Sequence, residues 1–183
     1  MVIFTSDNGG LWKATDHKPL RANKGSHYEG GIRVPMIIKA PGISKRGSVN
    51  SEPVITNDLY PTILDVAGLP LRSHQHVDGV SLSSLLGGKR SLDREALFWH
   101  YPHYNQHPSS APASIIRRGS WKLIEFLESG KIELYDLSND IGESTALAEA
   151  QPERAKRLLV ELRDWQIEVG AEPMRANPYY EGK

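Results

Sequence analysis

The second half of the chain contains four short apolar runs at close intervals, and this pattern restricts the fold more than any other feature. Each run has the length of a β-strand, and in chain order they cover residues 96–100, 113–118, 121–126 and 131–137. Gly119 and Gly130 separate the last three runs, where tight turns favour glycine. Short strands at such spacing predict an antiparallel sheet in which each strand pairs with the next.

A segment that begins at Pro152 has the periodicity of a helix with one apolar face. Apolar side chains recur at steps of three and four residues, at Ala155, Leu158, Leu162, Trp165 and Val169. We expect this face to pack on the predicted sheet. The polar side chains of the same segment, which we expect to be solvated, include Glu153, Arg154, Arg157 and Arg163.

The first half of the chain combines strand and helix patterns. The apolar run that starts at Val2 and the run Ile32–Lys39 predict two buried strands, because neither alternates clearly with polar residues. Residues 57–67 begin with capping side chains, carry an early proline and are followed by Gly68, which together predict a helix. Within it, we expect Asp58 to cap the helix rather than to face a site.

A change of pattern at about Ser91 predicts two parts, and the fold class is α/β. We expect residues 1–90 to form a mixed sheet with helices, and residues 91–183 to form a small antiparallel sheet packed on a C-terminal helix. The composition is that of a folded protein, with 39% hydrophobic and 24% charged residues.

The charge balance excludes two classes of partner. The chain has 22 basic and 22 acidic residues, so no net field favours nucleic acid or an anionic membrane. No apolar stretch is long enough to span a bilayer. The chain has no cysteine, so cysteine usage gives no indication of the cellular compartment.

A polar pair, Asp7-Asn8, ends the first apolar run and is followed by two glycines. In open α/β sheets, ligands bind just beyond the carboxyl ends of the strands. Asp7 offers a charged oxygen and Asn8 a neutral one, and both suit a hard divalent cation such as Ca²⁺. The alternative is a plain turn, because Asn-Gly is a strong turn signal.

A longer pattern follows the pair and resembles a known family. It reads Lys24-Gly25-Ser26-His27-Tyr28-Glu29-Gly30-Gly31-Ile32-Arg33-Val34-Pro35. Together with Ser-Asp-Asn-Gly at residues 6–9, the order, the residue types and the gap resemble the middle of type I sulfatases, in the alkaline-phosphatase-like superfamily. The resemblance implies an alkaline-phosphatase-like mixed sheet, a single Ca²⁺ held by Asp7 and Asn8, and a sulfate bound by Lys24.

The residue types agree with this chemistry. Negative charge develops on the leaving oxygen as a sulfate ester is cleaved, so the site needs fixed positive charge, which Lys24 and a cation supply. Phosphatases and phosphodiesterases of the superfamily usually have histidine in place of Asn8, so the amide favours sulfate over phosphate. A phosphatase or phosphodiesterase relative is the alternative. For Glu29 and Arg33 we expect a structural ion pair or a backbone clamp.

The resemblance also implies a nucleophile that this sequence does not contain. Sulfatases oxidise the first residue of a Cys/Ser-x-Pro-x-Arg stretch to formylglycine, and the stretches at Ser51 and Ser110 both lack the arginine. In the family this motif and the other metal ligands precede Ser-Asp-Asn-Gly. We therefore expect a fragment with half of the metal site, inactive in isolation. The alternative is a non-catalytic truncated module that binds metal or a sulfated sugar.

Three histidines lie close together between Trp99 and Pro108. Zinc is disfavoured, because prolines interrupt the segment and no cysteine or acidic residue completes a ligand set. By resemblance this loop lines the substrate pocket, which makes His100 and His103 candidate substrate contacts. A packed loop that supports the junction between the two parts is the alternative.

The resemblance implies a sulfuric ester hydrolase. Its substrate would be a sulfated carbohydrate or an aryl sulfate, and its location periplasmic, secreted or lysosome-like. A piece of an open sheet would expose an apolar edge, so we also expect self-association.

Overall fold

The computed structural model describes residues 1–108, 110–175 and 177–179. Its contacts divide the chain into two compact units. The first unit comprises Met1–Asp7 and Val34–Arg94, and the second comprises Asn8–Arg33 and Glu95–Lys183. The change of unit after Arg94 lies close to the expected boundary at residue 90. The segment Asn8–Arg33 packs with the second unit, which the expected division into 1–90 and 91–183 did not include.

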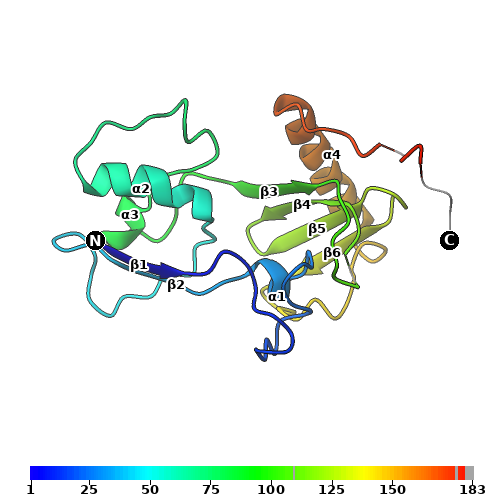
Figure 1. The fold of residues 1–183 in the computed structure, drawn as a ribbon, viewed down its shortest axis with the longest axis horizontal. Coiled ribbons are helices and arrows are strands. Elements are labelled where there is room, and N and C mark those ends of the chain that lie inside the picture. The colour runs from blue at the N-terminus through cyan, green and yellow to red at the C-terminus, as the bar shows by residue number, and fades with distance from the viewer. Residues whose placement is uncertain (109, 176, 180–183) are drawn as a thin grey trace. The chain divides into compact units, whose positions relative to one another are not determined.

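The first unit contains a two-stranded antiparallel ribbon of β1 (Val2–Thr5) and β2 (Met36–Lys39) (Figure 1). Phe4 pairs with Ile37, and both strands lie within the predicted apolar runs. The predicted burial is wrong, because Val2, Phe4 and Ile37 are 61 to 65% exposed. Paired residues of an antiparallel ribbon share one face, and this face is uncovered in the described part of the chain.

The second strand also begins later than predicted. Glu29–Ile32 forms a single helical turn, α1, so Ile32 ends a helix instead of starting a strand. The close approach of Gly30 and Gly31 to neighbouring backbone explains the turn, because added Cβ atoms would lie 2.3 Å from the Ala22 carbonyl oxygen and 2.2 Å from that of Ser26.

The predicted helix of the first unit is confirmed. A 3₁₀ turn, η1 (Thr56–Asp58), leads into α2 (Leu59–Val66), and Gly68 follows with φ +69°. A short helix, α3 (Ser83–Leu86), contacts α2. The capping prediction for Asp58 holds for the 3₁₀ turn alone, because its carboxylate accepts a hydrogen bond from the Ile55 N–H at 2.9 Å but makes no side-chain cap bond to α2. Its buried carboxylate also pairs with Arg94, with 2.7 Å between Nη1 and Oδ1.

The second unit contains the predicted four-stranded antiparallel sheet. Its strands are β3 (Ala96–Tyr101), β4 (Ala113–Arg118), β5 (Trp121–Phe126) and β6 (Ile132–Asp136), in the order β3-β4-β5-β6. Gly119 and Gly130 adopt φ +58° and +68° in the turns that follow β4 and β5, the backbone region that favours glycine. The meander prediction is therefore confirmed strand by strand.

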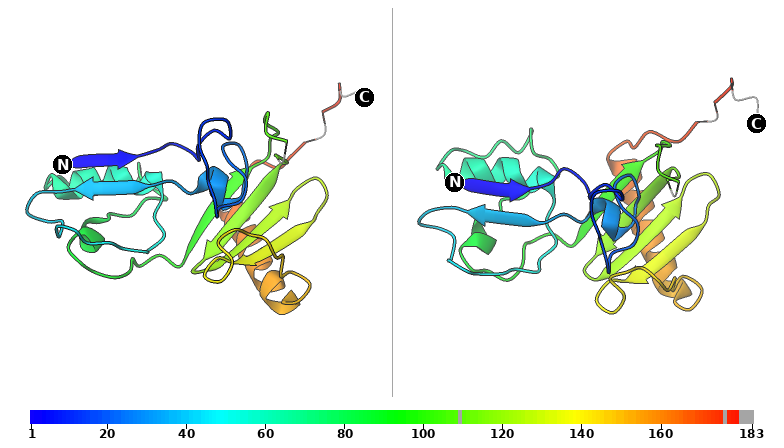
Figure 2. Two further views of the ribbon diagram at one scale, coloured as in Figure 1. Left: turned by 90° about the horizontal axis from the view of Figure 1, so that it is seen from below. Right: turned by 60° about the horizontal axis from the view of Figure 1, so that its bottom comes forward.

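The C-terminal helix α4 (Pro152–Glu168) covers one face of this sheet (Figure 2). Ala155, Leu158 and Leu162 are buried against the sheet residues Ile116, Leu123 and Leu134. The predicted apolar face is thus confirmed. One residue of the expected solvated face is an exception, because the Arg154 guanidinium lies over the Trp121 ring at 4.0 Å. No helix in the described ranges is both long and apolar enough to cross a membrane.

The opposite face of the sheet is covered by the segment Asn8–Arg33. Ile115, Ile124 and Tyr135 alternate along the strands with the residues that face α4, so they point to the other side. Tyr28 packs among them. Two covered faces explain why β4, β5 and β6 each carry apolar residues at two consecutive central positions, Ile115-Ile116, Leu123-Ile124 and Leu134-Tyr135.

Candidate functional site

The backbone around Asn8 is held close to α1 within the second unit. The Gly9 N–H donates to the Gly31 carbonyl at 2.8 Å, and the Lys24 N–H donates to the Gly10 carbonyl at 3.1 Å. An added Cβ on Gly9 would lie 1.9 Å from the Gly30 oxygen. Only glycine permits this approach, which brings the backbone beside Asn8 next to that of Lys24.

Asp7 and Asn8 offer the two oxygen donors that the sequence predicted for a cation. Asp7 is exposed and belongs to the first unit, whereas Asn8 is partly buried and belongs to the second. A carboxylate and an amide oxygen are a donor set that suits a hard cation such as Ca²⁺. Within residues 1–108, 110–175 and 177–179, no group of three or more His, Cys, Asp or Glu side chains could hold a metal ion. Because Ca²⁺ takes six to eight oxygen ligands, these two donors by themselves would make only part of a coordination shell.

Lys24 carries the positive charge of the predicted anion-binding step, which we define as Lys24-Gly25. Its side chain is exposed, and among the described residues its ammonium has no hydrogen-bond or ion-pair partner. The neighbouring Gly25 adopts φ +92°, a conformation that favours glycine. The Lys24 side chain is thus available to an anion.

The histidine-containing loop, residues 102–108, lies directly on Gly25. The Asn105 side-chain amide donates to the Gly25 carbonyl at 2.8 Å, and the Asn105 Oδ1 accepts from the His107 N–H at 2.8 Å. An added Cβ on Gly25 would lie 2.9 Å from the His107 Cβ. The structure therefore brings this loop next to Lys24 through Asn105, a residue for which the sequence predicted no role.

A second contact joins the same two segments. The His27 Nε2–H donates to the Ala111 carbonyl at 2.7 Å. Burial lowers the pKa of His27, more strongly than this hydrogen bond raises it. A neutral imidazole with a fixed tautomer is suited to hold the loop in place.

The two predicted histidines have different surroundings. Both ring nitrogens of His100 are in use, Nδ1 at 2.8 Å from the Ser114 Oγ and Nε2 at 2.7 Å from the Glu172 carbonyl. His103 is exposed, and its ring makes an edge contact with the Tyr101 ring at 5.6 Å. Of the two, His103 has the more accessible imidazole.

Tyrosines and an arginine anchor the segment on either side of Lys24. Tyr28 and Tyr135 both donate to the Glu133 Oε2, at 2.9 and 2.8 Å. Arg21 donates to the Tyr135 hydroxyl at 3.0 Å, and its guanidinium lies 3.8 Å from the centre of the Tyr28 ring. Burial, followed by the hydrogen bond to Glu133, raises the pKa of both phenols, which therefore stay protonated as donors.

A buried ion cluster lies beneath the same segment. Lys122 of β5 is 3.1 Å from Glu29 and 2.8 Å from Glu143, and all three side chains are at most 1% exposed. The Glu29 N–H donates to the Glu143 Oε2 at 2.6 Å. Arg33 reaches Glu29 at 3.3 Å, which confirms the predicted ion pair. Burial raises the pKa of Glu143, and Lys122 opposes the shift.

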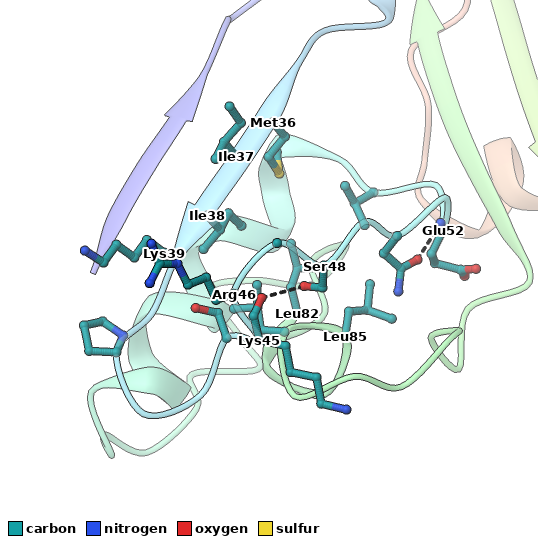
Figure 3. A pocket seen from close by; sticks show the side chains of 16 residues that line it. Met36, Ile37, Ile38, Lys39, Lys45, Arg46, Ser48, Glu52, Leu82 and Leu85 are labelled. Atoms are coloured by element: carbon teal, nitrogen blue, oxygen red, sulfur yellow. Dashed lines mark hydrogen bonds between the residues drawn. The ribbon is translucent and has the colours of Figure 1, made fainter.

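A pocket of about 790 Å³ lies in the first unit, apart from the predicted residues. Figure 3 shows its lining side chains, which include the apolar Ile38, Leu82 and Leu85 and the basic Lys45 and Arg46. It is lined by β2 and by segments near residues 44–54 and 82–86. None of Asp7, Asn8 and Lys24 contributes to its lining.

The chain matches a protein-family model. The model is described as "N-sulphoglucosamine sulphohydrolase, C-terminal" and matches residues 22–167. A protein named sulfatase from Formosa agariphila is 41% identical over 93% of this chain and 34% of its own length. Arylsulfatase K from Mus musculus is 35% identical over 89% of this chain and 29% of its own length. The chain thus spans about a third of these curated relatives.

Two solved structures show the same architecture. One was solved in complex with its substrate D-glucosamine-2-N,6-O-disulfate; it is 26% identical over 96% of this chain and 36% of its own, with a TM-score of 0.77. The other is Ps i-CgsB, which is 29% identical over 89% of this chain and 35% of its own, with a TM-score of 0.74. Ps i-CgsB was also solved in complex with k-i-k-neocarrahexaose.

Proposed function

Because the chain belongs to the sulfatases, in the family described as N-sulphoglucosamine sulphohydrolase, C-terminal, we propose that it supplies the anion-binding part of a sulfuric ester hydrolase. The observation that carries this proposal is Lys24. Its ammonium has no partner among the described residues. The Lys24 N–H bonds to the Gly10 carbonyl, and the carbonyl of the next residue, Gly25, accepts from the Asn105 side-chain amide. A fixed cation at such a step suits the sulfate group of a substrate.

Lys24 has two roles in this proposal. Its ammonium binds a sulfate oxygen, and it stabilises the negative charge that grows as the S–O bond breaks. His103, exposed on the loop next to Gly25, contacts the alcohol part of the substrate. His100 was predicted as a second contact, but its ring nitrogens already bond within the protein, so its role is to join β3 to Ser114 of β4 and to Glu172 after α4.

Asp7 and Asn8 would hold one Ca²⁺ together with donors from outside the described residues. A bound Ca²⁺ would neutralise charge on the sulfate group. The fit rests on the chemistry of these oxygen donors alone, and the described residues contain no group of three or more His, Cys, Asp or Glu side chains that could hold a metal ion.

A formylglycine nucleophile would also come from outside this sequence, since no Cys/Ser-x-Pro-x-Arg stretch occurs in its 183 residues. We therefore expect the chain in isolation not to turn over sulfate esters. A non-catalytic module that binds metal or a sulfated sugar is the alternative reading of the same site.

A sulfated carbohydrate is the proposed substrate class, with an aryl sulfate as an artificial substrate. The relative solved with D-glucosamine-2-N,6-O-disulfate supports it, and so does the one solved with k-i-k-neocarrahexaose. The periplasm, the exterior of the cell or a lysosome-like compartment would suit such a substrate. A second reaction class deserves a test, because a phosphonate monoester hydrolase is 29% identical, with a TM-score of 0.63 over 79% of the chain.

An arylsulfate turnover assay tests the proposal. It compares the 183-residue chain, the protein from the complete reading frame and the same protein with Lys24→Ala. We expect no turnover by the chain, turnover by the complete protein and a rate reduced by about 100-fold or more in the variant. Turnover of phosphonate but not sulfate esters by the complete protein would support the second class, and unchanged activity of Lys24→Ala would refute the role of Lys24.

A further inference from the structure

The Lys24 segment is attached to the sheet by charges that lie out of contact with solvent. Glu29 follows Lys24 by five residues, and its carboxylate bonds to the ammonium of Lys122, the second residue of β5. Its backbone N–H bonds to Glu143, which follows β6. Glu143 itself adopts φ +51°, an uncommon conformation for a residue other than glycine. Three segments far apart in the sequence therefore meet at one buried ammonium.

Such a cluster is a costly way to join a segment to a sheet. Burying a charge costs free energy, and this cost is offset only when the charge is paired and hydrogen-bonded. Well-packed apolar residues often stabilise a fold equally well. The other face of the same sheet is joined to α4 in that way, through Leu123 and Leu158. What an ion cluster adds to apolar packing is a fixed register, because its hydrogen bonds are directional.

We propose that Lys122 is a positioning residue for Lys24. By holding Glu29 and Glu143 in one arrangement, it fixes where α1 begins and hence where the Lys24-Gly25 step stands relative to Asn105. The inference rests on the proposed function of Lys24. It assigns no contact between Lys122 and the substrate, because the Lys122 side chain is fully buried.

Binding of inorganic sulfate to the 183-residue chain provides the test. Sulfate is titrated at constant ionic strength, and the backbone amide resonances of Lys24 and Gly25 report its Kd. The variants are Lys122→Met, Glu143→Gln, Lys24→Ala and the double variant Lys24→Ala/Lys122→Met. Leu158→Ala is the control, since it weakens the fold from the opposite face of the sheet. All are compared at a temperature where circular dichroism shows each to be folded.

The variants Lys122→Met and Glu143→Gln distinguish an effect on the position of Lys24 from an effect of the net charge. Lys122→Met removes a positive charge and Glu143→Gln removes a negative one, so long-range electrostatics would change sulfate affinity in opposite directions. If the cluster positions Lys24, both variants weaken binding by about fivefold, the value of roughly one hydrogen bond. Leu158→Ala leaves the Kd unchanged, and Lys122→Met has no further effect once Lys24 is alanine.

The remaining outcomes would count either against the positioning role of Lys122 or against the proposed function of Lys24. Opposite changes in Lys122→Met and Glu143→Gln, or an unchanged Kd in both, would overturn the positioning role. An equal loss of sulfate affinity in Leu158→Ala would show that the effect comes from lower fold stability, and this result would also overturn the positioning role. If Lys122→Met does not fold, Glu143→Gln and the Leu158→Ala control decide. Sulfate binding that is absent, or unaffected by Lys24→Ala, would instead count against the proposed function.

Discussion

The Asn105 side-chain amide donates a hydrogen bond to the Gly25 carbonyl at 2.8 Å, across 80 residues of sequence. This bond fastens the histidine-containing loop to the residue next to Lys24. It also explains why Gly25 is a glycine, since a Cβ there would lie 2.9 Å from the His107 Cβ. The candidate site is thus assembled from two segments that are unrelated in sequence.

Replacing Asn105 is expected to release this loop from Gly25. Asn105→Ala removes one neutral hydrogen bond, so we expect about 1 kcal/mol less stability and faster amide hydrogen exchange in residues 22–28 and 103–108. Hydrogen-exchange mass spectrometry measures the change. The matched control is Asn139→Ala, which removes a side-chain bond to Asp136 in the turn after β6. Equal exchange of residues 22–28 in Asn105→Ala and in the parent chain would contradict the role of the bond.

Calcium is expected to bind the isolated chain weakly. Asp7 and Asn8 supply two donors, whereas Ca²⁺ takes six to eight, so we expect a Kd on the order of 10⁻³ M or weaker. Isothermal titration calorimetry, or the shifts of the Asp7 and Asn8 amide resonances, would measure it. Asp7→Ala should abolish the shifts, and Asp16→Ala, a nearby exposed carboxylate, should not. Submicromolar binding, or binding that survives Asp7→Ala, would place the cation elsewhere.

The free energy of unfolding should fall in acid because the Glu133 carboxylate becomes protonated. Burial raises the pKa of Glu133, but hydrogen bonds from Lys131, Tyr135 and Tyr28 outweigh it, and the net pKa lies below the ordinary value of 4.5. A carboxylate with a depressed folded-state pKa stabilises the fold above its unfolded pKa, and this contribution is lost as the pH falls through the folded pKa.

Thermal unfolding between about pH 7 and about pH 3 measures this loss. In the parent chain the melting temperature should decline below about pH 4.5. Glu133→Gln should be less stable at neutral pH and should show a flatter decline, while Glu149→Gln, at an exposed position, should follow the parent curve. Parallel curves for Glu133→Gln and the parent would exclude Glu133 as the source.

The exposed face of the β1–β2 ribbon should promote self-association. Val2, Phe4 and Ile37 are each more than half exposed and share that face, so contact between two copies would remove apolar surface from water. We expect the molecular mass from solution scattering to rise with concentration. Phe4→Ser/Ile37→Ser should keep the chain monomeric, whereas Val77→Ser, at another exposed apolar residue of the first unit, should not. A parent chain that stays monomeric at high concentration would contradict the prediction.

The sheet and the C-terminal helix could be predicted because local patterns determine them. Gly119 and Gly130 mark two turns by their conformational freedom, and the spacing of Leu158 and Leu162 marks the face of α4. The burial of β1 could not be predicted this way. An apolar run indicates a strand, but its burial depends on which elements cover it, and Phe4 is exposed in the structure.

The residues of the candidate site also fall into two groups, those that the sequence predicted and those that only the structure revealed. Asp7, Asn8 and Lys24 lie in one short, ordered motif, so their residue types and spacing indicated the chemistry without any fold. Asn105 and Lys122 carry no such signal, because an asparagine in a loop and a lysine in a strand are usually solvated. Their importance arises from contacts with Gly25 and Glu29, which lie 80 and 93 residues away.

The sequence by itself determined the family motif, the four-strand meander and the amphipathic helix, since each depends on residues close together in the chain. Only the tertiary structure decided that Asn8–Arg33 packs on the face of the sheet opposite α4, and that a buried lysine holds it there. The physical reason is that long-range pairing of Lys122 with Glu29 and Glu143 satisfies buried charges, and such pairing leaves no periodic trace in the sequence.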